Sequence, residues 1–137
     1  MSGKPFFDTN ILVYAFGEND PRCEVARILL TTGGVISVQV LNELTAVLRR
    51  KLKMNWKDVS EALGAVRTLC PTVTPLTVDT HETALKIAEQ QGYAIYDSLI
   101  IAAALMAKTT TLYSEDMNDG QVIEDKLTIR NPFQKEK

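Results

Sequence analysis

The sequence predicts an α/β fold in which a mostly parallel β-sheet is packed between layers of helices. The main observation is that short apolar runs alternate with longer segments whose apolar residues follow helical spacing. Length supports it, because 137 residues, 45% of them hydrophobic, suffice for one core and are too few for two ordinary domains. We therefore expect one domain over residues 1–137, ordered over about residues 4–133.

The first half of the chain is predicted to alternate strands and helices. Asp20 before Pro21, and Asn55 three residues before Asp58, are typical helix N-termini, and Ser37 can cap a third helix. The elements expected are a strand at 5–8, an apolar run at 11–16 that leads to a turn, a helix from 21 to about 30, a strand at 35–36, a helix that carries Val40, Leu41, Leu44, Val47 and Leu48, a helix from 56 to 69, and an extended segment at 72–74.

The second half continues the alternation. A helix is expected over 80–91 with Gly92 as its C-terminal stop. Residues 97–107 are apolar nearly all round, which predicts a helix that is buried on most sides. Strands are expected at 110–113 and 127–129, and Asn131–Pro132 should mark the end of the ordered core.

Composition excludes several classes of protein. A formal net charge of −2 excludes nucleic-acid binding by overall charge, although a local basic patch remains compatible with it. The longest apolar run, 99–107, is too short to cross a membrane, and residues 1–8 lack a signal peptide, so a cytoplasmic protein is expected. Cys23 and Cys70 are expected to be buried thiols. With His81 as the single histidine, a histidine-rich zinc site is disfavoured, and so is a Ser-His triad unless His81 itself serves; His81 is expected at the surface or at a helix start.

Four acids are placed where the predicted fold brings chain segments together. Ligands of open α/β sheets lie beyond the carboxyl ends of the strands. Asp8 ends the first strand, and Asp116 follows the strand at 110–113. Glu43 lies at the border of an apolar helix stripe, and Asp97 begins the buried helix. Each also has a purely structural interpretation: Asp8 and Asp116 as turn residues, Asp97 as an N-cap, and Glu43 as a solvated helix residue.

Electrostatics decides what such a cluster requires. Two like charges ~4 Å apart repel by ~4 kcal/mol at an effective dielectric constant of about 20. Several such pairs would approach the whole stability of a small domain, on the order of 5–15 kcal/mol. Converged carboxylates must therefore be protonated or neutralised by cations. Oxygen-only ligands favour Mg²⁺ or Mn²⁺, and the chemistry implied is metal-assisted phosphodiester hydrolysis.

Four segments resemble, in order, the motifs of a known family, the PIN-domain nucleases. They are residues 6–15 (FFDTNILVYA), 37–44 (SVQVLNEL), 96–104 (YDSLIIAAA) and 112–121 (LYSEDMNDGQ). The last of these, together with Asn131–Pro132–Phe133, is similar to the end of the domain in the VapC-type toxins of toxin–antitoxin pairs. The likeness runs from Phe6 to Phe133, and four motifs in the family's order are more specific than any one of them.

The resemblance implies a PIN-like three-layer sandwich and an endoribonuclease that hydrolyses RNA with a water activated by Mg²⁺ or Mn²⁺. It implies a site of four acids, with Asp8 and Asp97 as principal metal ligands and Glu43 and Asp116 completing the coordination directly or through water. Thr9, Asn10 and Ser114 would orient the carboxylates, with Asp119 as an alternative or auxiliary fourth acid. The resemblance also implies products with 5′-phosphate and 3′-hydroxyl ends, a homodimer and a cognate antitoxin.

Residues that bind the substrate are less specifically indicated. A basic run ends the helix that carries Glu43, and it consists of Arg49, Arg50, Lys51 and Lys53. It either contacts RNA phosphates or is a solvated helix terminus whose cations suit the dipole. Trp56 and Tyr93 either stack on bases or belong to the core.

Two other functions compete with a nuclease. One is an Mg²⁺-dependent phosphatase with Asp8 as nucleophile. That chemistry usually has a second acid two residues further on, where this chain has Asn10. The other is a catalytically silent binding module, which would bind neither Mg²⁺ nor Mn²⁺ at millimolar concentration.

Overall fold

A six-stranded sheet forms the centre of the molecule, with the strand order β3-β2-β1-β4-β6-β5. The computed structural model describes residues 3–134; residues 1–2 and 135–137, which the predicted domain includes, lie outside the described residues. The strands are β1 (Phe6–Phe7), β2 (Val35–Ser37), β3 (Thr72–Thr74), β4 (Thr111–Tyr113), β5 (Val122–Ile123) and β6 (Leu127–Arg130). The edge strand β5 pairs antiparallel with β6, and the other pairings are parallel. The predicted mostly parallel sheet is confirmed.

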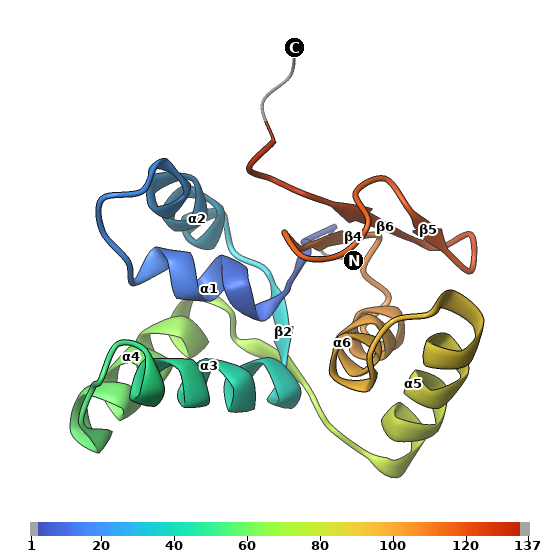
Figure 1. Ribbon diagram of the computed structural model, residues 1–137, viewed down its shortest axis with the longest axis horizontal. Coiled ribbons are helices and arrows are strands. Elements are labelled where there is room, and N and C mark those ends of the chain that lie inside the picture. The colour runs from blue at the N-terminus through green and yellow to red at the C-terminus, as the bar shows by residue number, and fades with distance from the viewer. Residues whose placement is uncertain (1–2, 135–137) are drawn as a thin grey trace.

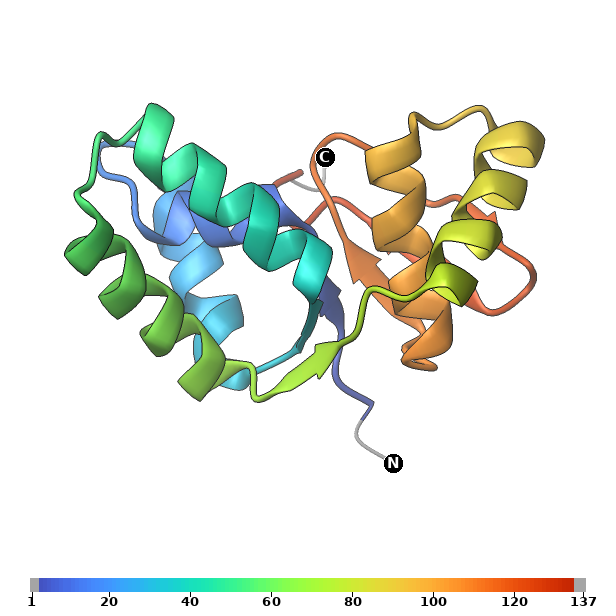
Figure 2. The same cartoon turned by 90° about the horizontal axis from the view of Figure 1, so that it is seen from below.

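Helices cover the sheet on both sides, which makes a three-layer α/β arrangement. Helices α1 to α4 lie on one side and α5 and α6 on the other, as the two views agree (Figures 1 and 2). Their bounds are α1 (Thr9–Ala15), α2 (Pro21–Thr32), α3 (Val38–Arg50), α4 (Trp56–Leu69), α5 (Val78–Gln91) and α6 (Ile95–Met106). Within residues 3–134, no helix is both long and apolar enough to span a bilayer.

Side-chain caps fix where most of these helices begin. The side chains of Asp20, Ser37 and Asn55 accept hydrogen bonds from backbone N–H groups at the starts of α2, α3 and α4, as predicted. Thr77 caps α5 in the same way, so this helix begins two residues before the predicted position 80. Gly92 ends α5 in the left-handed conformation, which glycine adopts without strain.

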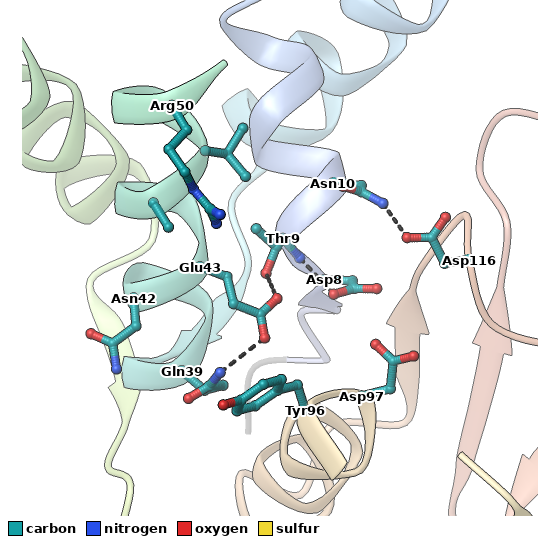
Figure 3. Close-up of a pocket in the computed structure, with 12 residues that line it drawn as sticks. Asp8, Thr9, Asn10, Gln39, Asn42, Glu43, Arg50, Tyr96, Asp97 and Asp116 are labelled. Atoms are coloured by element: carbon teal, nitrogen blue, oxygen red, sulfur yellow. Dashed lines mark hydrogen bonds between the residues drawn. The ribbon is translucent and has the colours of Figure 1, made fainter. Parts of the chain in front are cut away.

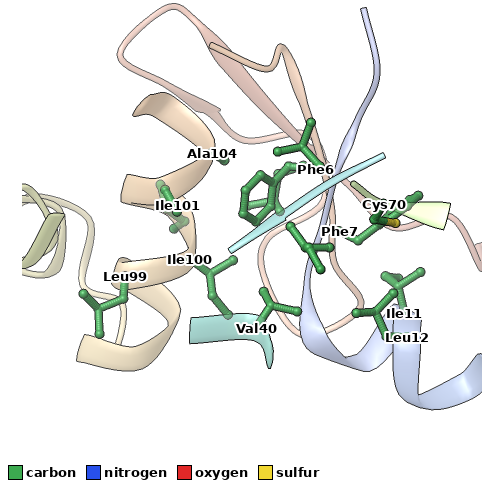
Figure 4. Close-up of a cluster of buried hydrophobic side chains, with 14 of the residues drawn as sticks. Phe6, Phe7, Ile11, Leu12, Val40, Cys70, Leu99, Ile100, Ile101 and Ala104 are labelled. Atoms are coloured by element: carbon green, nitrogen blue, oxygen red, sulfur yellow. The ribbon is translucent and has the colours of Figure 1, made fainter. Parts of the chain in front are cut away.

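The core lies between α6 and the central strands (Figure 4). Phe6 and Phe7 of β1 are fully buried, and residues 98–104 of α6 are buried on every face. This confirms the prediction that the apolar helix is enclosed on most sides. Cys23 and Cys70 are free, buried thiols, also as predicted.

Several sequence-based expectations need correction. The apolar run at 11–16 belongs to α1, which begins directly after β1 with Asp8 as its N-cap. Helix α6 begins at Ile95 with Ala94 as N-cap, so the interpretation of Asp97 as the cap is wrong. Trp56 is 61% exposed, so it does not belong to the core. The two-residue strand β5 was not expected, because two residues cannot show a period.

The chain connections place a ligand site between β1 and β4. From β1 the chain proceeds outward to β2 and β3 on one side, and it then returns to β4 on the other side of β1. Neighbouring parallel strands whose connections leave in opposite directions form a topological switch point, beyond whose carboxyl ends ligands bind. Asp8 and Ser114 are the first residues after these two strands.

Candidate active site

A pocket of about 570 Å³ lies at this switch point (Figure 3). All four predicted acids line it, and each comes from a different part of the chain: the end of β1, α3, α6 and the loop after β4. The fold therefore gathers carboxylates that are as far as 108 positions apart in the sequence (8 to 116). The lining residues are Asp8, Thr9, Asn10, Gln39, Asn42, Glu43, Ala46, Val47, Arg50, Tyr96, Asp97 and Asp116.

Asp8 is the most enclosed of the four carboxylates, with 4% of the residue exposed. Its Oδ1 accepts a hydrogen bond from the Thr9 backbone N–H at 2.7 Å, and its Oδ2 accepts one from the Ser114 hydroxyl at 2.7 Å. Burial, together with the charges of Asp97 and Glu43, raises the pKa of Asp8 to about 7 despite these two hydrogen bonds. An ionised Asp8 is therefore unfavourable in the metal-free site.

Glu43 is held on both sides by hydrogen bonds. The Thr9 hydroxyl donates to Oε1 at 2.9 Å, and the Gln39 side-chain amide donates to Oε2 at 2.9 Å. Gln39 lies one turn before Glu43 on α3, the spacing at which helix side chains meet. Gln39 was not among the residues predicted for the site, although its i, i+4 spacing to Glu43 is visible in the sequence.

Asp97 and Asp116 differ in how they are held. In the described part of the chain the Asp97 carboxylate makes no hydrogen bond or ion pair, whereas Asp116 accepts a hydrogen bond from the side-chain amide of Asn10. Burial raises the pKa of Asp97, and the charges of Glu43 and Asp116 add to the effect. The carboxylates thus interact with one another across the pocket.

The sequence left open whether Asp116 or Asp119 is the fourth acid of the site, and the structure distinguishes between them. Asp116 lines the pocket. The Asp119 carboxylate lies outside it and accepts a hydrogen bond from the Asn131 backbone N–H at 2.8 Å. This contact ties the loop to the chain after β6.

Of the four residues in the basic run at the end of α3, one lines the pocket and three lie outside it. Arg50 lines the pocket. Arg49 turns to the surface, where its guanidinium lies 4.4 Å from the centre of the Trp56 ring and donates to the Met54 carbonyl. Lys51 and Lys53 are exposed and are not part of the pocket wall. His81 is exposed on α5, away from the pocket.

A polar network next to the site was not predicted from the sequence. The Tyr14 hydroxyl donates to Glu115, and the guanidinium of Arg22 bridges Asp20 and Glu115 at 2.6 and 2.7 Å. The network joins α1 and α2 to the loop that carries Asp116. No local sequence signal reveals it, because Tyr14 and Glu115 are about 100 positions apart.

The donor set fits a hard divalent cation. The anionic groups in the pocket wall are the carboxylates of Asp8, Glu43, Asp97 and Asp116, with hydroxyl and amide oxygens beside them. Within residues 3–134, no three acid, histidine or cysteine side chains stand close enough together to hold one ion as they are. Mg²⁺ in proteins typically keeps several waters and takes only one or two protein carboxylates. Burial raises the pKa of Asp8 and of Asp97, and the neighbouring carboxylates add to the effect, so a cation bound between them would favour their ionised forms.

Comparison with solved structures supports the fold. The chain is similar to VapC20 of Mycobacterium tuberculosis, a toxin that cleaves the sarcin–ricin loop, at 22% identity and a TM-score of 0.66, over 81% of this chain and 88% of that one. It is similar to a toxin–antitoxin complex from Klebsiella pneumoniae at 17% identity and a TM-score of 0.72, over 95% and 98%. It is also similar to VapBC2 of Rickettsia felis, bound to a promoter DNA fragment, at 22% identity and a TM-score of 0.56, over 81% and 86%.

Comparison by sequence identifies the family. No curated protein matches the chain. The family model of the PIN domain matches residues 6–118, which include all four acids of the pocket and most of the sheet. The chain therefore belongs to the PIN-domain family.

Proposed function

We propose that this protein is a divalent-metal-dependent endoribonuclease and the toxin of a VapBC-type toxin–antitoxin pair. The observation that carries the proposal is the convergence of Asp8, Glu43, Asp97 and Asp116 in one pocket at the switch point of the sheet. Membership of the PIN-domain family supports it, as does the likeness to toxins and toxin–antitoxin complexes.

Asp8 and Asp97 are the proposed principal ligands of Mg²⁺ or Mn²⁺, and Glu43 and Asp116 complete the site directly or through water. When bound, the ion supplies a water of lowered pKa as nucleophile and neutralises charge on the scissile phosphate. The proposal accounts for the electrostatics of the pocket, since a divalent cation would favour the ionised form of each carboxylate.

The surrounding polar groups orient the carboxylates. The Ser114 hydroxyl and the Thr9 backbone N–H hold both oxygens of Asp8. The Thr9 hydroxyl and Gln39 hold Glu43, and Asn10 holds Asp116. Such outer contacts fix the direction of the lone pairs that face a cation, which supports a site organised before the ion binds.

The proposed partners are RNA as substrate and a cognate antitoxin protein, in a homodimer of this chain. The antitoxin follows from the likeness to solved toxin–antitoxin complexes. RNA and the dimer rest on the family resemblance of the sequence motifs.

The phosphatase alternative is less well supported. A phosphatase of this kind usually has a second acid two residues after its nucleophile, where this chain has Asn10. Asn10, two residues further on, bonds to Asp116 and does not supply a general acid.

In vitro cleavage of total RNA, with and without Mn²⁺ and read at nucleotide resolution, tests the proposal. The wild-type protein should cleave only with the metal, whereas Asp8→Asn and Asp97→Asn should be inactive with an unchanged circular dichroism spectrum. Asp125→Asn is the matched control, because Asp125 is an exposed turn acid outside the pocket. A fully active Asp97→Asn protein, or equal cleavage in chelator, would contradict the proposal. A phosphoryl group trapped on Asp8 would favour the phosphatase.

A further inference from the structure

The wall of the acidic pocket also contains an aromatic ring with no structural role. Tyr96 lines the pocket directly before Asp97 on α6, and 63% of the residue is exposed. Figure 3 shows its ring at the edge of the group of carboxylates, near Gln39. Among residues 3–134 nothing makes a hydrogen bond or a ring contact with the Tyr96 side chain.

The other three tyrosines each make a hydrogen bond or a ring contact that holds them in the fold. The Tyr14 hydroxyl donates to Glu115, the Tyr93 hydroxyl donates to Gln121 at 2.5 Å, and the Tyr113 ring stacks on Phe7. Even the exposed Trp56 is covered by a guanidinium. Tyr96 has no comparable contact, so packing does not explain an apolar ring in a polar pocket.

A cation lies on the other side of the same pocket. Among the described residues that line the pocket, Arg50 is the one with a positive charge. Its guanidinium forms no ion pair with any residue in the described part of the chain. It follows Glu43 by seven residues on α3, or roughly 10 Å along the helix axis. Glu43 lies between Arg50 and Tyr96 in Figure 3.

The Tyr96 ring, the Glu43 carboxylate and the Arg50 guanidinium therefore follow one another along one wall of the pocket, and Asp8, Asp97 and Asp116 line the same pocket beside them (Figure 3). Single-stranded RNA carries alternating features that match this order, because an unpaired base offers a flat face for stacking and the backbone offers phosphates. A base inside a duplex has no free face. A ring on the pocket wall therefore favours unpaired nucleotides.

On the basis of the proposed nuclease function, we propose that Tyr96 and Arg50 bind single-stranded RNA on either side of the acids. A nucleobase beside the scissile phosphate stacks on the ring of Tyr96, and a neighbouring phosphate is bound by Arg50. Because every base has a flat face, Tyr96 selects for unpaired nucleotides and not for one base.

Fluorescence quenching of 2-aminopurine, which reports stacking of that base, tests the proposal directly. The Asp97→Asn protein is titrated with a short single-stranded RNA that carries 2-aminopurine at one position at a time. One position should be quenched on binding. Adding Tyr96→Phe should preserve the quenching, whereas Tyr96→Ala should remove it and weaken binding by about 5- to 150-fold. Arg50→Gln should weaken binding. It should also make the fall of log affinity with log salt concentration less steep, by about 1 in the slope.

Leu85→Ala is the matched control, because Leu85 is a similarly exposed apolar side chain, 50% exposed on α5 and outside the pocket. It should change neither quenching nor affinity. Tyr96→Ala should also lower kcat/KM for single-stranded RNA in the otherwise wild-type protein, with the melting temperature unchanged.

Failure of this proposal is distinguishable from failure of the nuclease function. If the wild-type protein cleaves RNA but Tyr96→Ala alters neither quenching nor kcat/KM, the nuclease function stands and the RNA-binding role of Tyr96 is wrong. That result would instead favour contact of the exposed Tyr96 ring with a protein partner. If the wild-type protein cleaves no RNA, the nuclease function fails, and the quenching titration still decides whether RNA stacks on Tyr96.

Discussion

Replacing Asp8 with asparagine should stabilise the metal-free protein at neutral pH while it abolishes cleavage. The reason is the buried position of the carboxylate, which raises its pKa from 3.8 to about 7. A shift of roughly 3 units corresponds to about 4 kcal/mol of unfavourable free energy for the ionised form. Asparagine has nearly the same shape and carries no charge.

The sign of the pH dependence follows from proton linkage. Below pH 3.8 the Asp8 carboxyl is neutral in both the folded and the unfolded chain, and its full contribution to stability is present. As the pH rises from about 4 to 7, the unfolded chain loses the proton first, so the free energy of unfolding falls. Above the folded-state pKa of about 7 the loss is complete. The asparagine variant should lack this decline.

The net gain is smaller than the full pKa shift. The asparagine oxygen can still accept from the Thr9 N–H, but the Ser114 hydroxyl loses an ionised acceptor, which costs about 1 kcal/mol. We therefore expect Asp8→Asn to be more stable by about 3 kcal/mol at pH 8, or roughly 10 °C in melting temperature for a chain of this length. Asp97 and Glu43 face Asp8 across the pocket, and loss of its charge relieves them too.

Thermal and denaturant unfolding in EDTA at pH 4.5 and pH 8 measures this difference. At pH 4.5 the two proteins should be nearly equal in stability. Asp125→Asn, the same chemical change at an exposed turn, should have little effect at either pH. Mg²⁺ should raise the melting temperature of the wild type at pH 8 more than that of Asp8→Asn. If Asp8→Asn is no more stable than the wild type at pH 8, or if its advantage is equal at both pH values, the buried charge of Asp8 does not destabilise the folded protein.

Three further predictions concern other parts of the molecule. Gly34→Ala would place a Cβ against the Phe7 ring, closer than real Cβ atoms come, and should destabilise the fold by about 1–3 kcal/mol in denaturant unfolding, whereas Gly64→Ala, in open space on α4, should stabilise it by about 0.5–1 kcal/mol. Ser114→Ala removes a hydrogen bond that lowers the Asp8 pKa, so calorimetric titration at pH 7 should show weaker Mg²⁺ binding; an unchanged affinity would mean that Ser114 does not act through Asp8. Tyr14→Phe removes the hydroxyl that donates to Glu115 and should lower stability by about 1 kcal/mol; unfolding equal to that of the wild type would show that this contact contributes nothing.

Local interactions explain what could be predicted from the residues alone. The caps at Asp20, Ser37 and Asn55 bond to backbone groups two or three residues away, so their signals are contained in a few consecutive positions. The apolar composition of the α6 segment predicts its burial, and the alternation of strands and helices predicts the parallel sheet. The four pocket acids could also be predicted, because Asp8 and Asp116 follow strands, Asp97 lies in the first turn of a helix at the same edge of the sheet, and Glu43 borders the apolar stripe of its helix.

Contacts between distant segments explain what remained hidden. Whether Asp116 or Asp119 faces the pocket depends on the path of a loop held by Asn10, Tyr14 and Arg22, and no window of sequence contains these partners. The exposure of Tyr96 and Trp56 likewise depends on what other elements leave uncovered. Composition and spacing thus specify most of the helices and strands and all of the charges. The direction of each side chain at the site is set by packing between distant elements, which meet only because the chain returns across β1 to form β4.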